Sequence, residues 1–398
     1  MTYSTVVIVG AGPVGLTAAL VLGMSGIAVT LIEAEAAVSD ELRASTFHPP
    51  TLEMLEPFGI TARMLACGLI CPTWQVRMHP SGERAIFDLS VLRDETKHPY
   101  RLQCEQSKVG ELLCEALRDV PEVTLRFSER VTDIRQDREK VSLTTQSAQG
   151  EMTLSADYVI GADGARSTVR RCLDIDMEGE SYPETTILAT TTFPFQEHLE
   201  DLSNVSYCWK PNGIFSLLRL PDVWRVSLHP SAGMSIEEAM TPAAQQQMLH
   251  DIVPHAGPIE VLQTRPYRIH RRLAARYRKG RVFLAGDAAH LNSPSGGMGM
   301  NGGIDDAFNL CEKLIAVLRH GATADILDRY ERQRRPIAQE DIIQQADRNR
   351  SRMRERDPDR RRAILEDLQR TAADPARLKA YLLKSSMIEG LRRAASIQ

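Results

Sequence analysis

The segment from Val6 to Gly15, VVIVGAGPVG, constrains the fold more than any other part of the chain. The apolar run Val6–Val9 suits a buried parallel strand. A G-x-G-x-x-G pattern follows it, with glycines at Gly10, Gly12 and Gly15. In this pattern the first glycine allows a tight turn and the second lets a pyrophosphate approach the backbone. The third lets a helix pack close to the strand. The segment therefore predicts a βαβ dinucleotide-binding unit.

The residues that follow the glycines favour the same unit. A helix is expected from about Pro13 to Ser25, with Pro13 near its first turn, where a missing N–H costs little. The N-terminal amides and dipole of this helix favour a diphosphate. A second strand, 28–32, ends at Glu33, which lies 18 residues after the last glycine. That spacing is about the reach an acid needs to hydrogen-bond a ribose hydroxyl.

Composition excludes several classes of protein. The 398 residues carry a net charge of −4, so the chain lacks the basic footprint of a nucleic-acid-binding protein. No stretch of about 18 apolar residues predicts a membrane span. The seven cysteines are scattered without a zinc-ligand pattern, and the N-terminal apolar run belongs to the βαβ unit rather than to a signal peptide. We therefore expect reduced thiols, no metal site and a cytoplasmic location.

The order of predicted elements indicates an α/β fold with two interleaved domains and a helical C-terminus. A Rossmann-type nucleotide domain is expected over 1–182, with a strand excursion at about 74–104 that joins the second lobe. An antiparallel-sheet substrate domain is expected over 183–267. The nucleotide domain resumes over 268–350, and helices fill 351–398.

Three local expectations concern element boundaries. Ser107 is a plausible cap for a helix reaching Asp119, and 152–154 and 157–160 read as separate strands. The glycine-rich run 292–303 is expected to be a loop that leads into an apolar helix from about Gly302.

Two further motifs place aspartates at the ends of buried strands. Asp163 lies in GADGARS, where Ser167 starts a helix, and Asp287 lies in GDAAH. Each carboxylate sits on a glycine turn, where it can approach a nucleotide or accept hydrogen bonds from polyol hydroxyls. His290, at the end of the second motif, is expected to be structural.

In these motifs the chain resembles the class A flavoprotein aromatic hydroxylases, the para-hydroxybenzoate hydroxylase-like FAD monooxygenases. The glycines with Glu33, the DG motif at Asp163, the GD motif at Asp287 and the loop Pro294–Asn301 occur in the family's order. The similarity runs from residue 6 to about 310.

The resemblance implies FAD as cofactor, with NADH or NADPH as co-substrate. It also implies a set of FAD-binding residues: Gly10, Gly12, Pro13, Val14, Gly15, Glu33, Arg43, Gln106, Asp163, Gly286, Asp287, Pro294, Gly297, Gly299, Met300 and Asn301. Glu33 would hold the adenosine ribose and Asp287 the ribityl chain. Met298 and Gly110 depart from the family, since relatives often carry a polar and an acidic residue there.

The resemblance further implies hydroxylation of a phenolic or heteroaromatic small molecule. In the family, NAD(P)H reduces FAD, and the reduced flavin takes up O2 to form a C4a-hydroperoxide, which hydroxylates the ring. The second lobe offers Tyr207, Trp209, Phe215 and Arg225 as pocket candidates, and alternation places Tyr207 and Trp209 on one face.

Several points stay open at this level. The catalytic base is not identified, and His48 either points into the pocket or serves a turn. The expected partners are a small aromatic substrate and O2, with neither nucleic acid nor membrane, in a monomer or homodimer. One alternative is an FAD oxidoreductase of this fold whose oxidation is non-hydroxylating or non-aromatic. The other is a non-catalytic flavin-binding protein.

Overall fold

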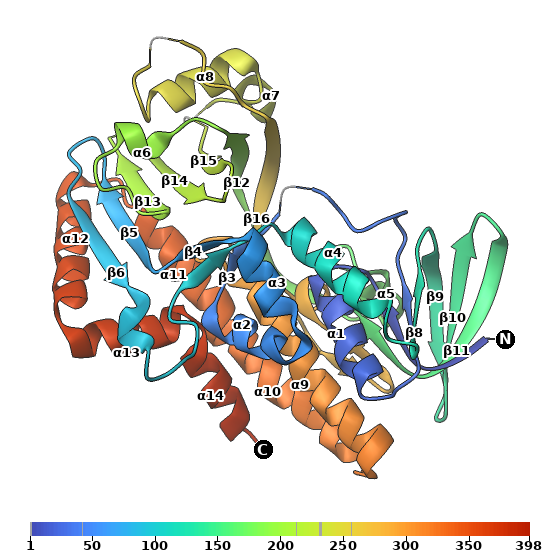
Figure 1. Cartoon of the computed structure of the whole chain (residues 1–398). Coiled ribbons are helices and arrows are strands. Elements are labelled where there is room, and N and C mark those ends of the chain that lie inside the picture. Colours follow the sequence, from blue (N-terminus) through green and yellow to red (C-terminus); the bar gives the residue numbers. More distant parts are fainter. Residues whose placement is uncertain (1, 42, 212, 231–232, 256) are drawn as a thin grey trace.

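The structure, a computed structural model, describes residues 2–41, 43–211, 213–230, 233–255 and 257–398. Figure 1 shows one sheet beside the N-terminus, a second sheet on the other side of the molecule, and the C-terminal helices along the second sheet. The predicted α/β architecture with a helical C-terminus is confirmed.

The first sheet contains the predicted βαβ unit. β1, β2, β8, β11 and β18 run parallel, in the order β18-β11-β1-β2-β8, and α1 packs against α4 and α9. The strands are β1 (Thr2–Val9), β2 (Val29–Ile32), β8 (Val123–Arg126), β9 (Arg130–Gln136), β10 (Val141–Ser147), β11 (Gly150–Gly161), β17 (Arg278–Lys279) and β18 (Val282–Leu284), and the helices are α1 (Pro13–Met24), α4 (Gln106–Leu117) and α9 (Gly299–His320).

Three local expectations were wrong. The two short strands at 152–160 are one strand, β11, because Ser155 and Ala156 continue the pairing with β10. Glu105 rather than Ser107 is the N-cap of α4, and its side chain makes no capping bond. α9 begins at Gly299, inside the run expected to be a loop.

The second sheet is built from distant parts of the chain. Its order is β19-β16-β12-β15-β14-β13-β5-β6, and β13 runs parallel to β5, whereas the other pairs are antiparallel. The strands are β5 (Thr73–Met78), β6 (Arg84–Asp88), β12 (Met177–Thr191), β13 (Val205–Lys210), β14 (Gly213–Arg219), β15 (Trp224–Leu228), β16 (Gln263–Ala274) and β19 (His290–Leu291). A small third sheet joins β3 (Thr46–Phe47), β7 (Arg101–Gln103) and β4 (Leu69–Cys71).

The two faces of the second sheet pack against different helices. One face forms a core with Phe195 of α6 and Leu249 of α8, and Figure 1 shows α6, α7 and α8 at this end of the molecule. On the other face, Trp74 of β5 and Trp209 of β13 pack with Leu365 and Leu382 from the C-terminal helices. The remaining helices are α2 (Pro49–Leu55), α3 (Ile60–Cys67), α5 (Thr168–Cys172), α6 (Phe195–His198), α7 (Ile236–Ala239), α8 (Pro242–His250), α10 (Asp328–Ile337), α11 (Gln344–Met353), α12 (Pro358–Ala373), α13 (Pro375–Ser385) and α14 (Ile388–Ser396).

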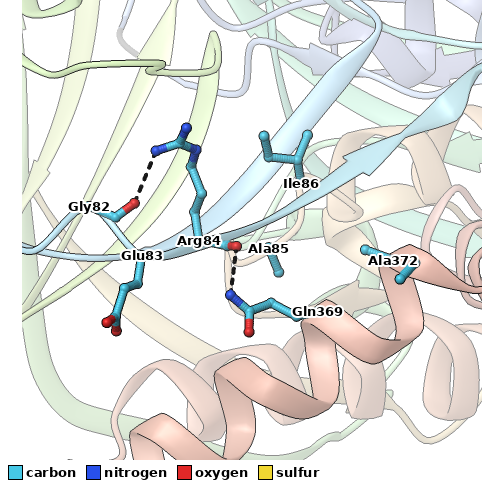
Figure 2. Close-up of a pocket in the computed structure, with 8 residues that line it drawn as sticks. Gly82, Glu83, Arg84, Ala85, Ile86, Gln369 and Ala372 are labelled. Atoms are coloured by element: carbon cyan, nitrogen blue, oxygen red, sulfur yellow. Dashed lines mark hydrogen bonds between the residues drawn. The ribbon is translucent and has the colours of Figure 1, made fainter.

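A shallow groove lies between β6 and α12, on the side of the molecule away from α1 (Figure 1). Figure 2 shows Gln369 of α12 reaching across it to donate a hydrogen bond to the carbonyl oxygen of Arg84, at 3.1 Å. No helix of the described residues is both long enough and apolar enough to span a bilayer.

A buried charge network fixes α9 and α10 to the first sheet. Arg334 is fully buried, and its Nε donates to Oδ1 of Asp306 at 2.7 Å. Oδ2 of Asp306 lies 2.9 Å from Nε2 of His290 and accepts the backbone N–H of Gly286 at 3.1 Å. Burial alone would raise the pKa of Asp306, but Arg334 and His290 hold it below its usual value.

We predict that Arg334→Met lowers the free energy of unfolding by about 3–5 kcal/mol, because it leaves the carboxylate of Asp306 buried without its cation. Arg332→Met is the matched control, since Arg332 lies on the same helix with an exposed side chain. Urea unfolding of the two variants measures the difference, and an equal loss in both would contradict the network's role.

Candidate active site

The three glycines of the first motif have three different surroundings. Gly10 has φ +107°, and a Cβ there would lie 2.5 Å from the carbonyl oxygen of Ala162. A Cβ on Gly15 would lie 1.9 Å from the carbonyl oxygen of Gly10, so this glycine lets α1 approach β1. A Cβ on Gly12 would meet nothing within 4 Å. The open space beside Gly12, at the N-terminus of α1, suits a pyrophosphate.

Glu33 lies beside this turn, at the end of β2. Its Oε2 accepts a hydrogen bond from the N–H of Ala11 at 2.7 Å, and its Oε1 accepts one from the N–H of Glu35 at 2.9 Å. The carboxylate is therefore held next to the glycine turn, and its role as a ribose ligand stays a prediction.

The DG motif meets the first motif directly. A Cβ on Gly10 would lie 3.0 Å from Cα of Asp163, so the two turns are in contact. Oδ2 of Asp163 accepts the N–H groups of Thr168 and Val169, at 2.6 and 3.1 Å, at the start of α5. Oδ1 is buried without a partner among the described residues, and burial raises the pKa of this carboxyl. The site therefore offers a free acceptor beside the glycine turn.

The GD motif meets the first motif from the other side. Gly286 has φ +60°, and a Cβ there would lie 2.8 Å from the side chain of Val14 in α1. Asp287 is exposed to solvent, yet surrounding protein raises the pKa of its carboxyl, against the opposing charges of His290, Arg43 and His270. Because the carboxylate of Asp287 is exposed, the hydroxyls of a polyol could donate hydrogen bonds to it.

The glycine-rich run divides into a turn and the first turn of α9. The N–H of Gly297 bonds the carbonyl oxygen of Pro294 at 3.0 Å, whereas Gly299, Met300 and Asn301 belong to the helix. The first N–H groups of a helix lack intrahelical partners and favour negative charge. Met298, at the position where relatives often carry a polar residue, is 1% exposed and packs in the hydrophobic core.

The side chain of Asn301 is fully engaged by the protein. Its Oδ1 accepts the N–H of His48 at 3.0 Å and the hydroxyl of Thr51 at 2.8 Å. Its Nδ2 donates to the carbonyl oxygens of Thr46 and Gly297, at 2.8 and 2.7 Å. Only the backbone of Asn301 remains for a cofactor, so its side chain is a brace between residues 46–51 and the run 293–300.

Arg225 links the second sheet to the predicted cofactor residues. It is 2% exposed, its Nη1 donates to the carbonyl oxygen of Arg43 at 2.7 Å, and its Nη2 lies 3.4 Å from Oε1 of Glu105. The guanidinium of Arg43 instead pairs with Glu41 at 2.8 Å. The N–H of Gln106 bonds the carbonyl oxygen of Ala44 at 3.2 Å, so Gln106 is brought to the same segment.

The four pocket candidates do not share one face. Tyr207, Trp209 and Arg225 lie on the face that turns toward the C-terminal helices. Phe215 pairs with Cys208, between the two aromatic residues of β13, and therefore points to the opposite face, into the core under α6–α8. It is not part of the pocket that we propose below.

Only one of the two aromatic residues on β13 is partly exposed. Trp209 is 1% exposed, and its Nε1 donates to the carbonyl oxygen of Met353 at 2.9 Å, so it is a core residue. Tyr207 is partly exposed and lies edge-on to Trp74, with ring centroids 6.0 Å apart.

Two residues near the run 293–300 were not assigned roles from sequence. His48 is fully buried, and its Nε2 lies 2.9 Å from the carbonyl oxygen of Gly296. Burial, reinforced by the charge of Arg101, lowers the pKa of His48 to about 3. Arg101 gave no signal in the sequence except alternation with Gln103, which is too short a pattern to interpret.

Gly110, the other departure, has a packing reason. A Cβ on Gly110 would lie 2.5 Å from Cγ1 of Val38, because α4 packs closely on the segment after β2. An acidic side chain at this position would collide with that segment.

We predict that two alanine substitutions in the glycine motif affect different properties, the stability of the fold and the binding of FAD. Gly15→Ala should lower the free energy of unfolding by about 1–3 kcal/mol, because its methyl group forces α1 away from β1. Gly12→Ala should leave the apoprotein as stable as the parent but weaken FAD binding by about 1–3 kcal/mol, because its methyl group takes the pyrophosphate space. Apoprotein melting and FAD titration separate the two, and identical behaviour would contradict these roles.

We also predict that Asp287→Ala raises the dissociation constant for FAD about ten- to hundred-fold, as expected for losing a hydrogen bond to a charged acceptor. Asp222→Ala, at an exposed turn between β14 and β15, is the control. Equilibrium titration of apoprotein measures both, and an unchanged constant for Asp287→Ala would mean that this aspartate has no cofactor role.

Taken together, an open space at Gly12, a free oxygen on Asp163 and an exposed carboxylate on Asp287 fit FAD. Comparison with known proteins agrees. Residues 3–346 match the FAD binding domain family. The chain is 35% identical to para-nitrophenol 4-monooxygenase of Pseudomonas sp. (strain WBC-3) over 98% of this chain and 97% of that protein.

Two other relatives give the same picture. The chain is 34% identical to 6-hydroxy-3-succinoylpyridine 3-monooxygenase of Pseudomonas putida (strain DSM 28022 / S16), over 83% of this chain and 84% of that protein. The crystal structure of p-nitrophenol 4-monooxygenase from Pseudomonas putida DLL-E4 superimposes with a TM-score of 0.92 at 34% identity, covering 98% of this chain and 99% of that one. The chain therefore belongs to the FAD binding domain family and, within it, to the FAD-dependent aromatic monooxygenases.

Proposed function

We propose that the chain hydroxylates a phenol or a related heteroaromatic ring, using FAD, NADH or NADPH, and O2. The near full-length similarity to para-nitrophenol 4-monooxygenase carries this proposal and makes 4-nitrophenol the first substrate to test. In this proposal the ring lies against the face of the second sheet that carries Tyr207, beside the run 293–300.

The chain would hold FAD with the residues described above. The space at Gly12 would take the pyrophosphate, Glu33 the adenosine ribose and Asp287 the ribityl chain. The first N–H groups of α9 would face the flavin ring. When bound, FAD supplies the hydride acceptor and the chemistry that activates O2.

His48 offers a buried hydrogen-bond acceptor next to the run 293–300. A carbonyl oxygen only accepts hydrogen bonds, so the contact with Gly296 places the proton of His48 on Nε2. Nδ1 then carries a lone pair, and it is buried without a partner among the described residues. Because the pKa of His48 is about 3, the ring is neutral at physiological pH and can accept a hydrogen bond at Nδ1.

Three further features stay proposals. We keep the domain ranges 1–182, 183–267, 268–350 and 351–398, although β12 runs through the first boundary. We keep a cytoplasmic location, supported by seven cysteines that are all free thiols. We also keep a monomer or homodimer as the assembly.

Turnover in ¹⁸O2 tests the proposed function. We predict that NADH or NADPH oxidation by the holoenzyme rises at least several-fold with 4-nitrophenol or another phenol of a substituted panel. One labelled oxygen atom should enter the aromatic product. Tyr207→Ala should reduce this stimulation while leaving the FAD dissociation constant unchanged, and Tyr207→Phe should retain most of it, because the ring rather than the hydroxyl forms the wall.

The opposing result is equally specific. Nicotinamide oxidation that releases only peroxide and labels no aromatic product, across the whole panel, would overturn aromatic hydroxylation and favour an oxidoreductase that does not oxygenate rings.

A further inference from the structure

Arg101 differs from every other buried arginine of the described residues. It is 2% exposed, its Nε and Nη1 have no hydrogen-bond partner, and no described carboxylate pairs with it. The other buried arginines each donate to a carbonyl or a carboxylate: Arg77, Arg170, Arg225, Arg334 and Arg361.

A lone buried guanidinium is costly, because an arginine keeps its charge and loses its hydration. Arg101 receives one partial compensation, since its Cζ lies over the ring of Trp74 at 4.8 Å from the centroid. A ring face offers no lone pair to the N–H donors, so Nε and Nη1 of Arg101 remain available for an acceptor that the described residues do not supply.

Residues that neighbour Arg101 contact the run 293–300. In β7, alternation places Arg101 and Gln103 on one side, and Nε2 of Gln103 donates to the hydroxyl of Thr46 at 2.9 Å. Thr46 in turn packs against Gly297, where a Cβ would lie 2.9 Å from the Cβ of Thr46. His48 is also near enough for the charge of Arg101 to lower its pKa.

The same ring that stacks under Arg101 reaches the substrate face. Trp74 lies edge-on to Tyr207, with centroids 6.0 Å apart, so Arg101, Trp74 and Tyr207 form a continuous series from the third sheet to β13. Among the titratable neighbours, His48 is neutral and burial raises the pKa of Cys71 to about 12. The charge of Arg219 also acts on Cys71, but Arg219 is partly exposed and lies over the ring of Trp224, 5.8 Å from its centroid. Arg101 is therefore the buried positive charge of this cluster.

We propose that Arg101 binds the anionic oxygen of the aromatic substrate, so that the enzyme selects phenols in their ionised, phenolate form. This inference rests on the proposed function, since it places the ring between the run 293–300 and Tyr207. A charged, hydrogen-bonded pair with a guanidinium is strong when it is desolvated, and the anion supplies the partner that Arg101 lacks.

Binding of two matched probes to the holoenzyme tests the proposal. The probes are 4-nitrophenol, at a pH where it is ionised, and 4-nitroanisole, which has the same ring but no ionisable oxygen. Dissociation constants come from the change in flavin absorbance or fluorescence, so turnover is not needed. The parent enzyme should bind the phenolate about ten- to hundred-fold more tightly than the ether.

Three variants locate that preference. Arg101→Met should weaken phenolate binding about ten- to hundred-fold and leave ether binding nearly unchanged, while Arg101→Lys should keep part of the preference. Arg281→Met is the matched control, because Arg281 also stacks on an aromatic ring, that of Tyr158, at 5.3 Å, but in the first sheet. It should bind both probes as the parent does.

Two results would overturn the proposal: equal binding of both probes by the parent enzyme, or an unchanged preference in Arg101→Met. The parent comparison decides even if Arg101→Met fails to fold. If the enzyme hydroxylates the ring but Arg101→Met keeps the preference for phenolate over ether, only this inference is contradicted. An Arg101-dependent preference without any labelled aromatic product would remove the proposed hydroxylation instead.

Discussion

Four hydrogen bonds from one side chain hold the candidate site together. Asn301 accepts from His48 and Thr51 and donates to Thr46 and Gly297. The segment 46–51 and the run 293–300 are far apart in sequence, and this buried amide fixes both to the first turn of α9. An amide can do this because it combines an acceptor with two donors, whereas a carboxylate could satisfy only half of these bonds.

The next turn of the same helix adds charge to this arrangement. Asp306 bonds the N–H of Gly286, and Arg334 holds Asp306 while its Nη2 donates to the carbonyl oxygen of Gly302 at 3.1 Å. The turn that presents Asp287 is therefore tied to α9 by a hydrogen bond to a carboxylate that a fully buried ion pair holds in place. The ribityl and ring ends of the proposed cofactor site are thus set by one helix, so they are positioned relative to each other before any ligand binds.

Local features of the sequence predicted the backbone geometry of the glycine turn. The close approach of α1 at Gly15 depends on contacts within one βαβ unit, whereas Gly10 also contacts the end of β11 at Ala162, which a local pattern does not reveal. The end of β11 and the start of α5 at Ser167 also follow from local rules, because a strand and a cap are visible in a few residues. The start of α9 was misplaced, since four glycines within seven residues conceal a helix whose stability comes from packing.

The substrate half depends on tertiary contacts that a sequence does not display. Alternation places Tyr207 and Trp209 on one face, but only the packing of Met353 and the helices after it shows that Trp209 is covered. Phe215 was assigned to the pocket because its pairing with Cys208 was unknown. Arg101 was missed for the same reason: that its Nε and Nη1 lack a partner among the described residues is a property of the folded chain.

The contact between Gln369 and Arg84 has a consequence for the tendency of the protein to aggregate. β6 is the last strand of an eight-stranded sheet, and Ile86 on it is 41% exposed (Figure 2). Such an edge is a template on which a foreign strand can add and start aggregation. α12 packs along β6, and Gln369 donates a hydrogen bond to a backbone carbonyl of this strand. The helix therefore covers part of the edge to which a foreign strand could add. The C-terminal helices thus limit self-association as well as covering the core.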